Sequence, residues 1–127
     1  MANRNFFRKQ AMEREVKELY IEASIGASGA PTLSKKLGVA SMVRNSAGRY
    51  TITLEDKYNA LLQITQSRQL AAGAPGAVGG MVVRSEDVDG AKTIVIEFVD
   101  AAGAAVELVN GTVLRLKMDL KNTSVVR

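Results

Sequence analysis

Few residues of this chain are of a type that could carry out chemistry. Its 127 residues include no His and no Cys, so the commonest general base, the thiol nucleophile and nearly all zinc ligand sets are missing. Catalysis would depend on Asp, Glu, Lys, Ser or Tyr alone. We therefore expect no enzyme and no cofactor, and the sequence predicts no catalytic, cofactor-binding or metal-binding residue.

Two short polar segments could still suggest a reaction. Ser34, Lys35 and Lys36 place a hydroxyl beside two amines, but a Ser–Lys nucleophile pair needs a desolvated lysine. Adjacent lysines in a polar segment are expected in solvent. Glu55 and Asp56 are sequential and would not face each other as an acid/base pair; a short helical turn over residues 55–58, capped by Asp56, is the better interpretation.

Two further segments could suggest a ligand. Glu86, Asp87 and Asp89 carry oxygen ligands that suit calcium, yet a twelve-residue loop with a terminal Glu is missing, which favours a hairpin tip. The glycine-rich run 71–80 lacks the following helix and the Lys-Ser/Thr pair of a phosphate-binding loop. It predicts a surface loop, and a loop of this length can bind a partner. Its candidate contact residues are Ala74, Pro75 and Val78.

The elements that would position such groups begin with an N-terminal arm, residues 1–16. Residues 3–15 contain no Pro or Gly and mostly good helix formers, so the arm is predicted to be partly helical. A helix this short is marginal in water and should order on the body or on a partner. It would either fold back over the body or insert into a neighbouring subunit's groove. Its candidate contact residues are Phe6, Phe7, Arg8 and Met12.

Residues 17–127 are predicted to form a mostly β body. Apolar and polar residues alternate in short runs separated by turn residues, which indicates an antiparallel β-sandwich or a small barrel. Val39, Ser41 and Val43 should share one side of a strand, and Leu62 should share a side with Ile64. The runs are 19–25, 37–44, 49–54, 61–69, 81–85, 93–99, 104–108 and 114–120, and the clearest inward rows are Tyr50/Ile52/Leu54, Ile94/Ile96/Phe98 and Leu114/Leu116/Met118/Leu120.

Charge and hydropathy narrow the expected partners. The net charge is +4, from 17 basic and 13 acidic residues, and the basic residues are spread along the chain, as on a mixed soluble surface. A nucleic-acid footprint would need them clustered, so no specific nucleic acid is expected. The N-terminus lacks the apolar core of a signal peptide, and no stretch reaches the length of a membrane span.

Two runs of the sequence resemble proteins of tailed-bacteriophage virions. The run 38–58, GVASMVRNSAGRYTITLEDKY, follows the pattern G-x-A-S-x-x-R-x-x-x-G-x-Y-T-x-T-L-x-D-x-Y. The run 98–125, FVDAAGAAVELVNGTVLRLKMDLKNTSV, places a D-x-x-G turn and an N-G turn before a long last strand that ends in K-N-T-S. Both runs are similar to segments of capsid decoration (cement) proteins.

This resemblance implies a small β-sandwich, often jelly-roll-like, that decorates and stabilises a capsid. Such a protein would sit on the outer capsid surface of the virion as a homotrimer or a dimer, after synthesis in the host bacterial cytoplasm. It would bridge neighbouring major capsid proteins. The resemblance assigns no contact residues.

Two other functions stay open at this point. The first is a head or tail fibre domain that binds a host-surface glycan, for which Tyr20, Tyr50 and Tyr58 are the available aromatic platforms, with Tyr50 predicted to face inward. The second is a small hydrolase that uses Glu55 or Asp56, which the lack of His and Cys disfavours.

Overall fold

The part of the chain that the computed structural model describes, residues 16–70 and 80–122, forms eight strands, and alternating apolar residues are clearest in β4 (Arg49–Leu54) and β8 (Val113–Lys121). A short 3-10 turn, η1 (Ala27–Gly29), follows the first strand. The strands are β1 (Val16–Ile25), β2 (Pro31–Leu37), β3 (Val39–Ser46), β4 (Arg49–Leu54), β5 (Ala60–Gln69), β6 (Gly80–Asp87), β7 (Thr93–Val99) and β8 (Val113–Lys121).

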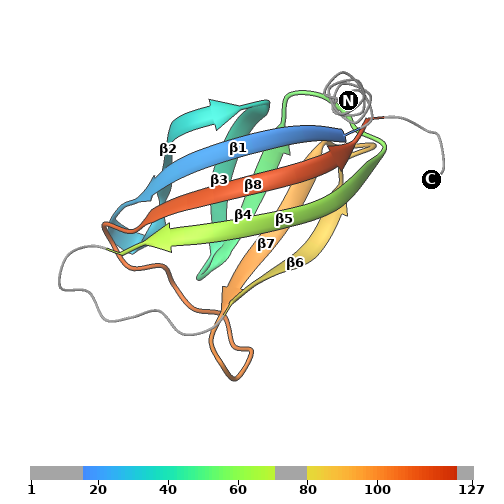
Figure 1. Ribbon diagram of the computed structural model, residues 1–127. Helices are drawn as coiled ribbons and strands as arrows, with labels where there is room; N and C mark the ends of the chain where they lie inside the picture. Colours follow the sequence, from blue (N-terminus) through green and yellow to red (C-terminus); the bar gives the residue numbers. More distant parts are fainter. Residues whose placement is uncertain (1–15, 71–79, 123–127) are drawn as a thin grey trace, which may run out of the picture.

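The strands form two antiparallel sheets that pack face to face (Figure 1). The order is β2-β1-β8-β5 in the first sheet and β3-β4-β7-β6 in the second. β2 and β3 are consecutive strands in different sheets, and Gly38 between them has a φ of +76° that favours glycine. The predicted mostly β, antiparallel sandwich is confirmed.

The strand order differs from the jelly-roll-like winding that the resemblance implies. β1–β2, β3–β4 and β6–β7 are pairs of successive strands within one sheet, whereas a jelly roll places most successive strands in opposite sheets. The turns explain the difference, because a short connection favours antiparallel pairing of the strands that it joins. Of the pairs that a jelly roll would make, the described sheets contain β1–β8 and β4–β7.

The core lies between the sheets and consists of the predicted inward rows. The tyrosine, isoleucine and leucine of β4, the apolar row of β7 and that of β8 are all buried. Tyr50 and Phe98 meet edge to face, with ring centroids 5.9 Å apart, a favourable geometry for aromatic pairs. Burial of these rows is the main favourable contribution to folding.

Two β-bulges change which side chains reach the core. Between Val39 and Ser41 the register of β3 shifts against β4, so Val39 and Met42 are buried and Val43 is 55% exposed. A shift between Leu61 and Gln63 in β5 likewise leaves Leu62 51% exposed. The predicted sides of Val43 and Leu62 are wrong because one extra residue in a strand reverses the facing of every residue beyond it.

Three local predictions are corrected. The strand β2 was not predicted, because it is an exposed edge strand that pairs with β1 through its backbone and shows little apolar alternation. Residues 55–58 form a bend rather than a helical turn, since the backbone N–H of Tyr58 donates to the carbonyl of Val88. The segment 104–108 makes one isolated bridge, between Val99 and Ala105, instead of a strand.

The predicted helical arm falls in residues 1–15, apart from its last residue, and these lie outside the described residues. Val16, the last residue of the predicted arm, is the first residue of β1.

Candidate interaction surfaces

The seven contact residues predicted from the sequence lie outside the described part of the chain. Phe6, Phe7, Arg8 and Met12 belong to residues 1–15, and Ala74, Pro75 and Val78 belong to residues 71–79. Candidate surfaces are therefore built from the sheets themselves and from the ends of the sandwich.

The Ser34–Lys35 segment lies on edge strand β2 and has a structural role. The Ser34 hydroxyl donates to the backbone carbonyl of Glu22 at 3.0 Å and also lies 3.1 Å from a Glu22 carboxylate oxygen. Lys35 is 78% exposed, with its Nζ 3.8 Å from the same carboxylate. A solvated lysine is a poor base for activating a serine. Lys35 instead forms a surface ion pair with Glu22.

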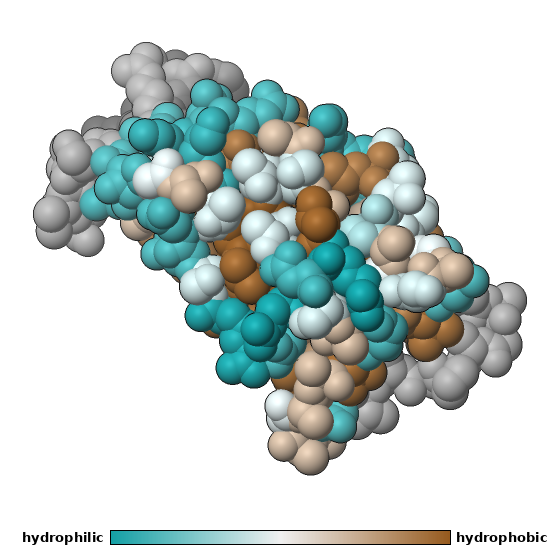
Figure 2. Space-filling model, turned by 180° about the vertical axis from the view of Figure 1, so that it is seen from behind, coloured by the Kyte–Doolittle hydropathy of each residue, from teal (hydrophilic) through white to brown (hydrophobic). Residues whose placement is uncertain are grey.

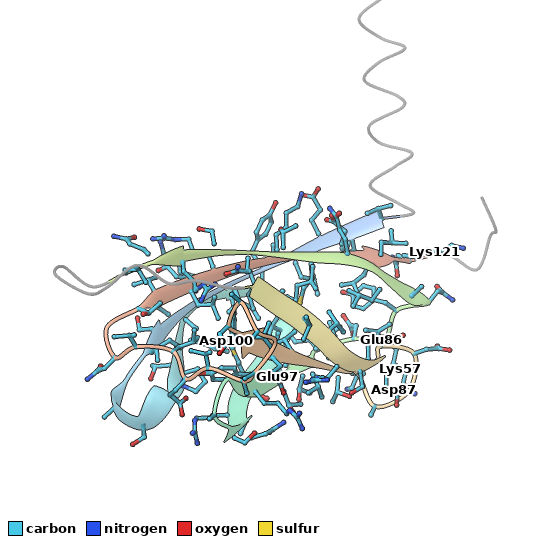
Figure 3. All side chains as sticks on the ribbon, turned by 90° about the horizontal axis from the view of Figure 1, so that it is seen from below. Lys57, Glu86, Asp87, Glu97, Asp100 and Lys121 are labelled. Atoms are coloured by element: carbon cyan, nitrogen blue, oxygen red, sulfur yellow. The ribbon has the colours of Figure 1, made fainter. Side chains whose placement is uncertain are left out.

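The acidic turn between β6 and β7 uses its carboxylates to hold its own backbone. Asp87 accepts a hydrogen bond from the backbone N–H of Ala91 at 2.9 Å, and Glu86 accepts one from that of Val88 at 3.2 Å. Figure 3 places both acidic residues at the same end of the sandwich as Lys57. Within residues 16–70 and 80–122 no group of three or more acidic, His or Cys side chains could hold a metal ion.

The outer face of the second sheet carries a buried carboxylate between two arginines. Glu97 of β7, labelled in Figure 3, alternates with the core residues Ile96 and Phe98 and so points away from the core. It is nevertheless only 3% exposed. Arg49 of β4 donates to Glu97 Oε2 at 2.6 Å, and Arg84 of β6 donates to Oε1 at 2.5 Å. These charge-assisted hydrogen bonds lower the pKa of Glu97.

Apolar and weakly polar side chains surround this ion triad. Val43 on β3 and Val82 on β6 are 55% and 40% exposed. On β4, Thr51 pairs with Val43, and Thr53 follows two residues further along the same side of the strand. Figure 2 shows the face from behind, with apolar residues spread across it and strongly polar atoms among them. Apolar area around a few well-held charges is the usual anatomy of a protein–protein contact. We call this surface the valine face.

The outer face of the first sheet is more polar and contains a groove of about 410 Å³. Tyr20 borders it, together with Glu22, Arg115 and hydroxyl-bearing residues of β5. The Tyr20 hydroxyl donates to Glu18 at 2.9 Å, and this hydrogen bond raises the pKa of Tyr20. Glu22 accepts a hydrogen bond from Arg115 at 3.1 Å, which lowers the Glu22 pKa. We call this the tyrosine groove.

The three tyrosines therefore differ in what they can offer a ligand. Tyr20 is 45% exposed, whereas Tyr50 is fully buried, as predicted, and Tyr58 is 7% exposed. Burial raises the pKa of Tyr50 to about 12. Only Tyr20 can serve as an aromatic platform among the three.

A larger pocket, of about 610 Å³, lies where β1 begins. The described residues that line it come from the start of β1, from the β2–β3 corner and from the bend after β4: Val16, Lys17, Glu18, Leu19, Leu37, Gly38, Glu55, Asp56 and Tyr58. Its lining combines apolar side chains with three carboxylates and one lysine. Burial, with a further contribution from the charges of Asp56 and Glu55, raises the pKa of Tyr58. We call this the corner pocket.

Contacts between residues far apart in sequence, which were not predicted, connect the strands to the loops. Arg44 of β3 donates to both carboxylate oxygens of Glu107, and the Tyr50 hydroxyl donates to the carbonyl of Gly29 at 2.8 Å. The ion triad has a signal in the sequence at Glu97, where a charged residue interrupts the apolar run of β7. The two arginine partners of Glu97 are 48 and 13 residues away, and no local pattern connects them.

Comparisons add no assignment to these surfaces. In residues 16–70 and 80–122 no helix is long and apolar enough to cross a membrane. No family model, no curated protein and no solved structure matches this chain.

Proposed function

We propose that the chain is a bacteriophage virion structural protein that decorates and stabilises the capsid by bridging neighbouring major capsid proteins. The proposal rests on the resemblance of runs 38–58 and 98–125 to cement proteins. The observation that supports it best is the valine face, where Val43 and Val82 flank the Arg49–Glu97–Arg84 triad. In this proposal the valine face lies against the shell, and the chain acts as a homotrimer on the outer capsid surface.

The valine face has the properties that such a contact requires. Glu97 already has its hydrogen bonds, so covering it with a partner adds little desolvation cost for that carboxylate. The arginines are 42% and 48% exposed and can still donate to carboxylates or carbonyls of a capsid subunit. Val43 and Val82 would supply the apolar contact area. Many identical copies on one shell would strengthen attachment through avidity.

The arm and the 71–79 loop remain proposed as additional contacts. Phe6, Phe7, Arg8 and Met12 would supply apolar and charged anchors, and Ala74, Pro75 and Val78 a second, smaller contact. Neither set is needed to explain why the valine face is apolar.

The test uses shells of the phage that encodes the chain, prepared from a strain in which its gene is deleted. The full chain should co-sediment with these shells and raise the temperature at which they rupture. Val43→Asp, at an exposed position of the valine face, should lower occupancy at least about tenfold because it places an unpaired charge in the contact. Leu62→Asp is the matched control, since Leu62 is similarly exposed but lies on β5 of the other sheet. Equal binding by both variants would remove the valine face from the proposal.

The tyrosine groove favours a second candidate, a fibre domain that binds a host-surface glycan. A sugar can stack its C–H face on Tyr20 while Arg115 and the hydroxyls of Thr65 and Ser67 hydrogen-bond its oxygens. Binding of the full chain to a glycan array, lost in Tyr20→Ala, together with location of the chain in purified fibres, would support this candidate. Location on the shell without glycan binding would support the first.

A further inference from the structure

The corner pocket combines apolar and acidic side chains at the point where the arm leaves the body. Leu37, 57% exposed, and the partly exposed Val16 contribute its apolar surface, whereas Leu19 is buried beneath them. Its described lining residues include one lysine against three carboxylates, a net charge of −2. Glu18 is already engaged by Lys117 at 3.2 Å, whereas Glu55 and Asp56 are exposed and make no ion pair with any described residue.

The arm has the opposite composition. Residues 1–15 contain four basic and two acidic residues, a net charge of +2. Phe6 and Phe7 are adjacent, and Arg8 and Lys9 follow them directly. Two aromatic side chains beside two cations match a pocket lined by apolar and acidic side chains, in both hydrophobicity and charge.

The position of Val16 decides which copy's arm can enter. Val16 itself lines the corner pocket, so each arm begins at the rim of its own pocket. Phe7 precedes Val16 by nine residues, about 14 Å along a helix. To reach its own pocket the arm would have to reverse direction within residues 8–15, which contain no Gly or Pro and are mostly good helix formers. The arm of a second copy needs no such reversal.

We propose that the corner pocket receives the arm of a second copy of this chain, with Phe6 and Phe7 against Leu37 and with Arg8 beside Glu55 and Asp56. Each copy then donates one arm and receives one, either reciprocally in a dimer or in a closed ring such as a trimer. This self-association goes beyond the proposed capsid contact, which uses the valine face. It is measured on the free chain without shells, so its failure would leave that proposal standing.

Cross-linking identifies the occupant directly, because the chain contains no cysteine of its own. One full chain carries Phe7→Cys and a second, with an added affinity tag, carries Leu37→Cys; the two are mixed, allowed to exchange and oxidised. We expect a disulfide-linked species of tagged and untagged chains on a non-reducing gel. Leu62→Cys in place of Leu37→Cys is the control and should give at least about tenfold less of this species, as expected for a residue outside the pocket.

Two results would overturn the proposal. If the double variant Phe7→Cys/Leu37→Cys forms its disulfide only within one chain, the pocket holds its own arm. If no disulfide joins positions 7 and 37 in either arrangement while circular dichroism shows folded protein, the arm does not enter the pocket.

Sedimentation velocity measures the energetic side of the same contact. Leu37→Ser should weaken self-association at least about tenfold, the equivalent of about 1.4 kcal/mol, whereas Leu62→Ser should leave it within about twofold because its side chain lies outside the pocket. Glu55→Lys should weaken association similarly, and adding Arg8→Glu to it should restore part of the loss. Asp89→Lys, an equal charge change on an exposed turn residue that does not line the pocket, is the control. Unchanged association in both Leu37→Ser and Glu55→Lys would contradict the proposed contact.

Discussion

Replacing Tyr50 by Phe would remove one hydrogen bond from the core and leave the packing intact. The Tyr50 ring is fully buried and meets Phe98 edge to face, and Phe keeps that contact. The lost hydroxyl donates to the carbonyl of Gly29 at 2.8 Å, and Gly29 is the buried residue of an otherwise exposed turn. A buried carbonyl left without its donor costs about 1–3 kcal/mol, so Tyr50→Phe should lower the free energy of unfolding by about 2 kcal/mol.

Urea unfolding followed by far-ultraviolet circular dichroism measures this loss. The midpoint should fall while the slope with urea stays constant, because the exposed surface on unfolding does not change. Tyr20→Phe is the matched control: its hydroxyl bonds to Glu18 on an exposed face, and the midpoint should hardly move. A loss below about 0.5 kcal/mol for Tyr50→Phe would mean that water or a rearranged turn replaces the donor.

The same variant should also change the dependence of stability on alkaline pH. Burial raises the pKa of Tyr50 from 10.0 to about 12. As the pH rises through this window, the unfolded chain loses a proton that the folded chain retains, so the folded state becomes less stable. Phe has no such proton. The stability difference between wild type and Tyr50→Phe should therefore shrink from about pH 9 upward, and a difference that stays constant to about pH 12 would refute the assignment.

Three further predictions concern turns, acid stability and the core. Gly48 has a φ of +72°, and an added Cβ would lie 2.9 Å from the Phe98 carbonyl oxygen, whereas Gly103 has a φ of +87° and an added Cβ there would meet nothing within 4 Å. Gly48→Ala should therefore destabilise the fold more than Gly103→Ala, for which only the left-handed strain of about 1–2 kcal/mol applies. Thermal unfolding of both variants separates the strain from the steric contact. Glu97, whose pKa the arginines lower from 4.5, stabilises the fold above that pH and loses this contribution as the pH falls through its folded pKa; urea titrations between about pH 2 and 6 should show a flatter acid limb in Glu97→Gln, and an unchanged limb would contradict the triad's role. Met118→Ala, at a fully buried position, should lower the free energy of unfolding by about 2–5 kcal/mol in urea titrations, and a loss below about 1 kcal/mol would indicate a collapsible core at β8.

Strands with one face in the core and the other toward solvent could be predicted from the order of residues alone. In β4 and β8 the apolar rows alternate with polar residues, and in β7 the row of every second residue includes no charge. The structure buries all three rows as predicted. The turns at residues 47–48 and 88–91 contain Gly48 and the pair Asp89-Gly90, and they were also predictable because Gly and Asp adopt turn conformations at low cost. These features depend on neighbours in sequence, so a local pattern contains the necessary information.

Which exposed residues gather into one surface depends on how the strands pair and pack. Val43 and Leu62 reach solvent through bulges whose position depends on the partner strand, and β2 exists because β1 offers it a backbone ladder. The corner pocket joins residues 16–19, residues 37–38 and the residues 55, 56 and 58, from three segments that are separate in the chain. Ion pairs such as Arg49–Glu97 likewise form across strands, because pairing register brings together residues that sequence distance keeps apart. Chemistry that depends on residues meeting in space could not be predicted from their order in the chain, whereas the absence of His and Cys was evident from the sequence alone.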